Sequence, residues 1–145
     1  MDQVKDILNK KGYDIWMVKS DDSIRTALTL MNEKKIGAVL VRNAKGQIEG
    51  IFSERDFARA CSMNNTLSLD IPIKDYMSKR VICVNPQQTI ENCLALMTEK
   101  RIRHLPVVDD EKPVGLISIG DVVKAFIWEK DFLIDQLESY ISGSL

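Results

Sequence analysis

Apolar residues recur in the same order twice along this chain of 145 residues. Each round opens with a short apolar run rich in β-branched residues, at residues 15–18 and 81–84, which predicts a strand. A hydroxyl residue, Ser23 or Thr89, then precedes apolar positions at helical spacing, so we predict a helix with that residue as its N-cap. The helical positions are Ile24, Ala27, Leu28 and Met31 in the first round and Ile90, Cys93, Leu94 and Met97 in the second.

Two further strands and a second helix complete each round. The strands are predicted at residues 38–41 and 48–52, and again at 104–108 and 114–117, with a polar turn inside each pair. The second helix begins near Ser53 or Ser118, and a short helical lead-in, at residues 4–8 or 73–77, precedes each round. Each round is therefore β-α-β-β-α, which gives an α/β (α+β) fold class. One round of about 60 to 65 residues buries too little surface to be stable alone, so we expect the two to pack as one pseudo-symmetric module.

Residue identities indicate that the two rounds are copies of one unit. The offset between them is 66 residues as far as Val41 and Val107, and 65 residues from Gly50 and Gly115 onward. Two copies of this length indicate a duplicated half-domain, because a solenoid needs several stacked units. We place repeat 1 at residues 1–68, repeat 2 at residues 69–130 and a C-terminal helical extension at residues 131–145.

A hydroxyl and a carboxylate three residues apart follow the last strand of each copy. The pairs are Ser53 with Asp56, and Ser118 with Asp121. The hydroxyl can donate to a phosphate or ribose oxygen, and the carboxylate can accept two hydrogen bonds from the vicinal diol of a ribose. The same pair can instead cap its own helix. Its recurrence, each time three residues after a glycine that would let a ligand approach the backbone, favours binding over capping.

A basic pair precedes the Leu-Pro-Val run of the second copy. Arg103 and His104 are predicted phosphate ligands, because a guanidinium can donate two parallel hydrogen bonds to phosphate oxygens. Pro106 is also included in the predicted site. The alternative is an ordinary solvated strand entry. The matching residues of the first copy, Gly37 and Ala38, have no charge, so the two sites are expected to differ in their affinity for phosphate.

Three more residues are weaker candidates for ligand contacts. Arg55 lies inside the first motif, where the second copy has Gly120, and its alternative is a lone surface arginine. Lys19 and Asn85 follow the first predicted strand of each copy and could border the ligand.

The C-terminal residues 122–141 predict a long amphipathic helix. Its apolar members are Phe126, Ile127, Phe132, Leu133, Ile134, Leu137 and Tyr140. This apolar face is larger than a half-domain needs, so we expect a partner subunit to cover it. The alternative is packing against the first lead-in helix within the same chain.

Bulk properties exclude several classes of protein. The net charge is −1 with both signs interspersed, which is not the electrostatic footprint of a nucleic-acid-binding protein. No apolar run approaches the roughly 20 residues of a membrane span, and the N-terminus lacks the pattern of a signal peptide. The three cysteines follow no disulfide or metal spacing, so we expect a reducing, cytoplasmic location.

Catalysis is not expected. The chain has one histidine, no glycine-rich phosphate loop, no metal-ligand cluster and no nucleophile beside a base. We therefore predict no catalytic residue, no metal and no obligatory cofactor.

The duplicated β-α-β-β-α order, the Gly-Ile-Phe-Ser-Glu-Arg-Asp and Gly-Leu-Ile-Ser-Ile-Gly-Asp motifs and the Arg-His-Leu-Pro-Val strand resemble a tandem pair of cystathionine-β-synthase (CBS) domains, also called a Bateman module. The resemblance covers about residues 1–130, and it is closer to small stand-alone CBS pairs than to modules fused to enzymes.

The resemblance implies regulatory binding of an adenosyl compound: AMP, ADP, ATP, S-adenosylmethionine or NAD(H). It implies that Asp56 and Asp121 hold ribose hydroxyls, with Ser53 and Ser118 on ribose or phosphate. It also implies a homodimer. The leading hypothesis is thus a non-enzymatic adenine-nucleotide sensor with a possible client protein. The alternative is an interaction or scaffold protein whose pocket is vestigial.

Overall fold

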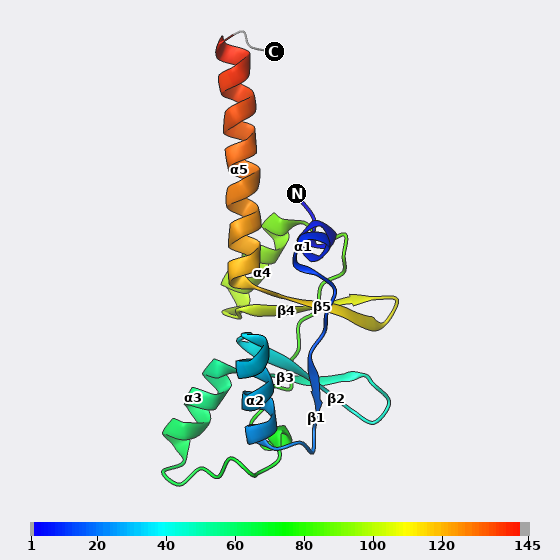
Figure 1. The fold of residues 1–145 in the computed structure, drawn as a ribbon, viewed down its shortest axis with the longest axis vertical. Helices are drawn as coiled ribbons and strands as arrows, with labels where there is room; N and C mark the ends of the chain where they lie inside the picture. The colour runs from blue at the N-terminus through cyan, green and yellow to red at the C-terminus, as the bar shows by residue number, and fades with distance from the viewer. Residues whose placement is uncertain (1, 143–145) are drawn as a thin grey trace. The chain divides into compact units, whose positions relative to one another are not determined.

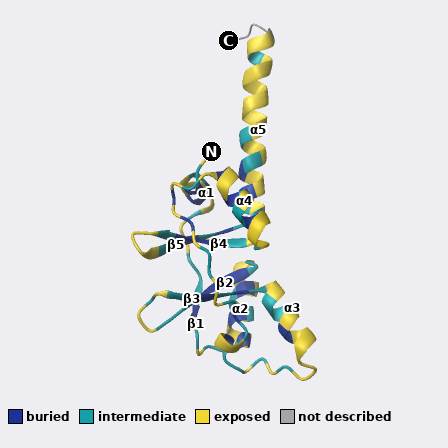
Figure 2. Ribbon diagram, turned by 180° about the vertical axis from the view of Figure 1, so that it is seen from behind, coloured by how far each residue is buried: buried dark blue, intermediate teal, exposed yellow. Residues whose placement is uncertain are grey.

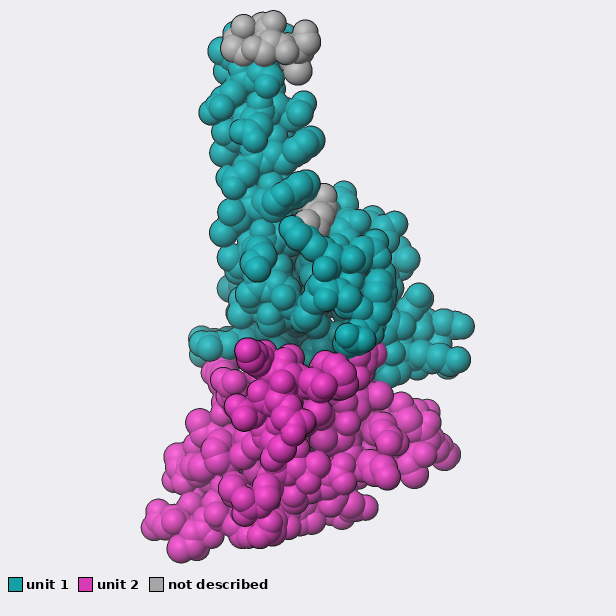
Figure 3. All heavy atoms as spheres, in the orientation of Figure 1, with its two compact units in different colours: residues 1–14, 83–145 teal, residues 15–82 magenta. Residues whose placement is uncertain are grey.

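The computed structural model describes residues 2–142 and divides the chain into two compact units (Figure 3). Unit 2 contains residues 15–82, and unit 1 contains the described residues on either side of that range.

Unit 2 contains one three-stranded sheet and the helices that cover it (Figure 1). Its elements are β1 (Met17–Lys19), α2 (Ile24–Lys34), β2 (Ala38–Arg42), β3 (Ile48–Ser53), α3 (Glu54–Met63) and the short 3-10 turn η1 (Ile73–Asp75). The strand order is β1-β2-β3, with β1 parallel and β3 antiparallel to β2. The core forms where the buried face of α2, including Ile24 and Met31, packs with Val39 and Phe52 of the sheet.

Unit 1 repeats this plan with a two-stranded sheet. Its elements are α1 (Val4–Lys11), α4 (Ile90–Lys100), β4 (His104–Asp109), β5 (Lys112–Ser118) and α5 (Ile119–Ser142). The predicted N-caps are confirmed in both units, since the hydroxyls of Ser23 and Thr89 accept from backbone N–H groups three residues later, at 3.1 Å in each case. Both capped helices also end on a left-handed residue, Lys35 or Arg101.

The strand predicted at residues 81–84 is wrong. The second copy has only an isolated parallel bridge between Val84 and Val107. Two hydrogen bonds hold it: the Val84 N–H donates to the carbonyl of Pro106 at 3.0 Å, and the Val108 N–H donates to the carbonyl of Val84 at 2.9 Å.

Two prolines explain why this ladder is so short. In unit 2 the N–H groups of Leu40 and Ser20 extend the corresponding ladder, each donating to the neighbouring strand at 3.3 Å. The residues at these two positions of the second copy are Pro106 and Pro86, and proline has no N–H to donate. The outer hydrogen bonds are lost on both sides, and a single bridge remains.

Each lead-in segment packs on the other copy. Helix α1 is the lead-in of repeat 1 but lies in unit 1, where the Val4 N–H donates to the carbonyl of Gln88 at 2.9 Å. The turn η1 is the lead-in of repeat 2 but lies in unit 2, where the Ile73 N–H donates to the carbonyl of Asp22 at 2.8 Å. Asp22 and Gln88 occupy the same position in the two repeats, at the offset of 66 residues. Each lead-in therefore makes the same backbone hydrogen bond to the other copy. The compact units therefore have boundaries that differ from those of the sequence repeats.

The predicted C-terminal helix is confirmed as α5, and its two halves differ in burial (Figure 2). Val122 and Ala125 are buried, while every residue described from 130 to 141 except Ser139 is exposed. The first half also packs against α4 and α1. No helix within residues 2–142 is long and apolar enough to cross a membrane.

Candidate functional site

The first Ser/Asp pair lies where β3 passes into α3. Ser53 caps α3 by accepting from the Asp56 N–H at 3.3 Å, and the carboxylate of Asp56 accepts from the Ser53 N–H at 2.8 Å. The Ser53 hydroxyl is also 3.0 Å from Asp56 Oδ2. This is a reciprocal capping box. Asp56 is largely enclosed, with 11% of its side chain exposed.

The second pair has the same geometry at the junction of β5 and α5. The Asp121 N–H donates to the Ser118 hydroxyl at 3.1 Å, and the Ser118 N–H donates to Asp121 Oδ2 at 2.9 Å. A lysine is added here, because Lys11 Nζ of α1 lies 2.6 Å from the same oxygen. Lys11 also donates to the carbonyl of Leu116 at 2.8 Å. The lysine thus ties α1 to the end of β5 and to the start of α5.

Lys11 changes the electrostatics of Asp121. Burial alone would raise the pKa of this carboxyl, but the hydrogen bonds from Lys11 and from the Ser118 N–H, together with the lysine charge, outweigh burial and hold the pKa below its ordinary value. Asp121 is therefore a charged acceptor at neutral pH, although only 25% of its side chain is exposed.

The glycines of both motifs serve packing inside each unit, which corrects the interpretation that they admit a ligand. A Cβ on Gly115 would lie 2.6 Å from a methyl carbon of Leu8, and a Cβ on Gly50 would lie 2.5 Å from the sulfur of Met77. Leu8 and Met77 occupy equivalent places in the two exchanged lead-ins. The space over each glycine is filled by that side chain.

The structure brings the basic pair of the second copy to the start of α5. In the β4–β5 register His104 lies opposite Ser118, and the Ile119 N–H donates to the carbonyl of Arg103 at 2.8 Å. Pro106, by contrast, is buried inside β4 opposite Leu116, so it belongs to the sheet beneath the site.

Unit 2 has the equivalent backbone arrangement, with the uncharged residues Gly37 and Ala38 at these two positions. Ala38 lies opposite Ser53, and the Glu54 N–H donates to the carbonyl of Gly37 at 3.1 Å. The difference in phosphate affinity that this would cause stays a prediction. Arg55 lies in the first turn of α3, beside the Ser53–Asp56 pair.

Lys19 and Asn85 are not brought to this end of the sheet. Lys19 lies opposite Arg42 at the far end of β2, four residues and about 13 Å from Ala38, which is opposite Ser53. Asn85 likewise follows the bridge of Val84 to Val107, on the far side of His104. Strand β1 is parallel to β2, so it runs away from the Ser/Asp pair. The residues that follow it therefore lie at the opposite end of the sheet from that pair.

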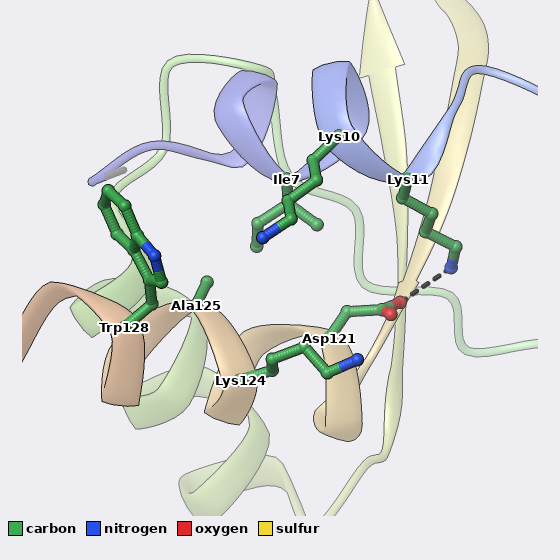
Figure 4. Close-up of a pocket in the computed structure, with 7 residues that line it drawn as sticks. All are labelled: Ile7, Lys10, Lys11, Asp121, Lys124, Ala125 and Trp128. Carbon is green, nitrogen blue, oxygen red and sulfur yellow. Dashed lines mark hydrogen bonds and ion pairs between the residues drawn. The ribbon is translucent and has the colours of Figure 1, made fainter. Parts of the chain in front are cut away.

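Asp121 also borders a pocket of about 320 Å³ between α1 and α5 (Figure 4). Its lining residues are Ile7, Lys10, Lys11, Asp121, Lys124, Ala125 and Trp128. Three lysines against one carboxylate make the lining cationic, and Trp128 adds an aromatic face at the end remote from Lys11. Sequence reasoning missed these lysines because nothing in the pattern indicates that α1 packs on the second copy.

Metal ligation has no support in the part of the chain that the structure describes. Within residues 2–142 no group of three or more His, Cys, Asp or Glu side chains is arranged to hold a metal ion. The cysteines there are unpaired: Cys61 and Cys83 are exposed, and Cys93 is buried.

Comparison with known proteins gives consistent matches. The family described as CBS domain matches twice, over residues 4–62 and 73–127. The CBS domain-containing protein CBSX3, mitochondrial, of Arabidopsis thaliana is 32% identical over 149 residues, which cover 97% of this chain and 72% of that protein. The crystal structure of the CBS-domain containing protein ATU1752 from Agrobacterium tumefaciens is 40% identical, with a TM-score of 0.82 over 86% of this chain and 92% of that one.

Two other similar structures were solved with adenosyl compounds. The CBS domain pair of protein MJ0100 is in complex with 5′-methylthioadenosine and S-adenosyl-L-methionine; it is 25% identical, with a TM-score of 0.77 over 88% of this chain and 97% of that one. PAE2072 from Pyrobaculum aerophilum is complexed with AMP; at 22% identity and a TM-score of 0.73, over 82% of this chain and 88% of that one, it is a likeness of fold.

Proposed function

Since this chain belongs to the CBS domain family, we propose that it is a regulatory module that binds an adenosyl ligand and needs no obligatory cofactor. The observation that supports this most is the matched pair of enclosed carboxylates, Asp56 and Asp121, each at the start of a helix and each beside a serine. The similar structure in complex with S-adenosyl-L-methionine and 5′-methylthioadenosine supports the ligand class.

Capping and ligand binding do not exclude each other at these carboxylates. In both pairs the capping hydrogen bonds fall on Oδ2. A carboxylate has about four acceptor positions, so Oδ1 keeps capacity for a ribose hydroxyl, also at Asp56, where Oδ1 lies 3.7 Å from Nη1 of Arg59. The capping box then serves to hold the acceptor in a fixed orientation before the ligand arrives, which lowers the entropy cost of binding.

The surroundings of Asp121 favour an anionic ligand. Lys10, Lys11 and Lys124 line the adjoining pocket, and Arg103 lies at the start of α5. Cations at this density attract phosphate groups and disfavour the sulfonium cation of S-adenosylmethionine. We therefore place AMP, ADP, ATP or NAD(H) ahead of S-adenosylmethionine at this site, and we assign weaker phosphate recognition to the Asp56 site, which has Gly37 and Ala38 instead.

Calorimetry with AMP, ATP, NADH and S-adenosylmethionine tests the proposal. Asp121→Asn and Asp56→Asn remove the charge of the acceptor, and a charge-assisted hydrogen bond contributes about 1.5–3 kcal/mol, so each variant should lose tenfold or more in affinity at its own site. The matched control is Asp135→Asn on the exposed half of α5. Wild-type affinity in both site variants, with unchanged melting temperatures, would rule out the assignment.

A second candidate function is a scaffold or interaction protein with a vestigial pocket. The observation in its favour is that both carboxylates already hydrogen-bond to their own helices. A thermal-shift panel distinguishes the two, because a ligand at a hundred times its Kd stabilises a protein by about 2.7 kcal/mol. No shift with any adenosyl compound at millimolar concentration supports the scaffold.

Three finer points complete the proposal. We expect a homodimer that presents a client-binding surface in a ligand-dependent way, because α5 has an uncovered apolar face. We expect a reducing, cytoplasmic location, because the three cysteines are unpaired. We expect no catalysis, and turnover of a bound nucleotide that disappears in Ser118→Ala would overturn that expectation.

A further inference from the structure

The second half of α5 has an apolar face, interrupted by Lys130, that unit 1 does not cover. Ile127, Ile134 and Leu137 are 53%, 51% and 54% exposed, and Ile141 is 83% exposed. Figure 2 shows this half of the helix as almost wholly exposed. The aromatic pair Trp128 and Phe132 stacks on another side of the same helix, with ring centroids 5.9 Å apart.

The exposed face has the spacing of a coiled-coil seam. Its positions alternate by four and three residues: Val123, Ile127, Lys130, Ile134, Leu137 and Ile141. One edge of this seam is apolar, with Phe126, Leu133 and Tyr140 seven residues apart. The other edge is charged, with Lys124, Asp131 and Glu138 at the same interval. A helix with such a seam and two unlike edges is suited to pair with one other helix.

We propose that residues 123–141 of α5 pair in antiparallel orientation with the same residues of a second copy of this chain, centred at the level of Phe132. This register places Ile127 opposite Leu137 of the second copy, and Val123 opposite its Ile141. The apolar edges then meet each other, as do the charged edges, because the two-fold axis relates identical surfaces. The inference deepens the proposed homodimer by naming its surface, and it does not depend on nucleotide binding.

The charges of α5 select the antiparallel orientation. In this register Lys124 lies beside Glu138 of the second copy. The two Asp131 side chains meet near the two-fold axis, where Lys130 of each copy lies beside Asp131 of the other and offsets their repulsion. A parallel pair would instead bring the two Lys130 side chains together in the seam, and like charges there oppose association. The paired stretch of 19 residues is about 28 Å long, or roughly five helical turns.

The test begins with the mass of the protein in solution, measured by analytical ultracentrifugation over a wide range of concentrations. The wild type should form a dimer. Ile134→Asp places a charge in the apolar seam and should weaken the dimer by at least about tenfold, whereas Gln136→Asp, on the opposite face of the helix, should leave it intact. Circular dichroism of both variants confirms that the helix is retained.

A charge exchange tests the orientation. Lys124→Glu and Glu138→Lys each create like-charge contacts in an antiparallel pair and should each weaken self-association by at least about tenfold. An equimolar mixture of these two variants restores both contacts, so it should dimerise as well as the wild type does.

Three results would overturn the inference: a wild type that stays monomeric, a dimer that survives Ile134→Asp, or a mixture that does not reassociate. The second of these would leave the homodimer of the proposed function in place and move it to another surface. Nucleotide affinity, measured on the wild type and on Ile134→Asp, reports separately on the proposed ligand site, because Ile134 lies outside the pocket that Lys124 lines.

Discussion

Lys11 and Asp121 form an ion pair at 2.6 Å, which joins the first helix of the chain to the last. The lysine and the Ser118 N–H together keep the pKa of Asp121 below its ordinary value, in spite of burial. Because the folded-state pKa is lowered, this stabilisation is present above the unfolded-state pKa of about 3.9, and it is lost as pH falls through the folded-state pKa.

Lys11→Met should therefore raise the pKa of Asp121, because burial then acts against a weaker set of opposing hydrogen bonds. The carboxyl carbon shift of Asp121, followed by NMR through an acid titration, gives the midpoint in each protein. Lys10→Met is the matched control, since Lys10 lines the same pocket while the ion pair is formed by Lys11. An unchanged midpoint in Lys11→Met would show that the ion pair does not set this pKa.

Substitution of the two motif glycines should destabilise the fold unequally. A Cβ on Gly115 meets a methyl carbon of Leu8, which can rotate, whereas a Cβ on Gly50 meets the backbone carbonyl of Ser78 at 2.9 Å as well as Met77. Overpacking costs about 1–3 kcal/mol, so we expect Gly115→Ala near the low end and Gly50→Ala near the high end. Urea denaturation measures both. Equal losses, or none, would contradict the packing role.

The three cysteines should react with a thiol reagent at different rates near neutral pH. Burial raises the pKa of Cys93 to about 11, and it also raises the pKa of Cys83. The thiolate is the reactive form, so we expect the order Cys61, then Cys83, with Cys93 modified only after unfolding. Peptide mapping after timed alkylation identifies each site. Rapid modification of Cys93 in folded protein would mean that α4 opens readily.

Replacing Pro106 should lengthen the short bridge of the second copy. Pro106→Leu supplies the N–H that Leu40 has in unit 2, where it donates at 3.3 Å to the neighbouring strand. We expect slow hydrogen exchange at residue 106. The net change in stability should be below about 1 kcal/mol, since the new hydrogen bond is offset by the greater freedom of the unfolded chain. The control is Pro113→Ala in β5. Fast hydrogen exchange of the residue 106 N–H in Pro106→Leu would show that the proline is not the reason why residues 81–84 form no strand.

Local features of the fold follow from the sequence because local physics decides them. Ser23 and Thr89 cap the helices that they were predicted to cap, and the apolar residues behind them form the buried faces. The Ser/Asp pairs also lie at helix starts, as their spacing of three residues predicts.

What the sequence did not predict depends on contacts between distant segments. The strand pattern at residues 81–84 is apolar and β-branched, but the ladder needs an N–H that Pro106 lacks on the facing strand. Lys19 ends at the far edge because β1 runs parallel to β2, and a strand's direction is a tertiary property. The apolar pattern of a lead-in is compatible with packing on either copy. The sequence therefore could not predict that α1 packs on the second copy, nor that Lys11 forms an ion pair with Asp121.

The exchange of lead-ins has a consequence for dissecting this protein. Deleting residues 1–11 would leave unit 2 intact, because η1 packs there. The deletion would destabilise unit 1, because it removes the Leu8 side chain over Gly115 and the Lys11 partner of Asp121. Splitting the chain at the boundary between the sequence repeats would give two fragments, each lacking a segment encoded in the other. Each fragment would regain its native core only when the other fragment supplies the missing lead-in. The two repeats therefore cannot be separated into independently folding halves.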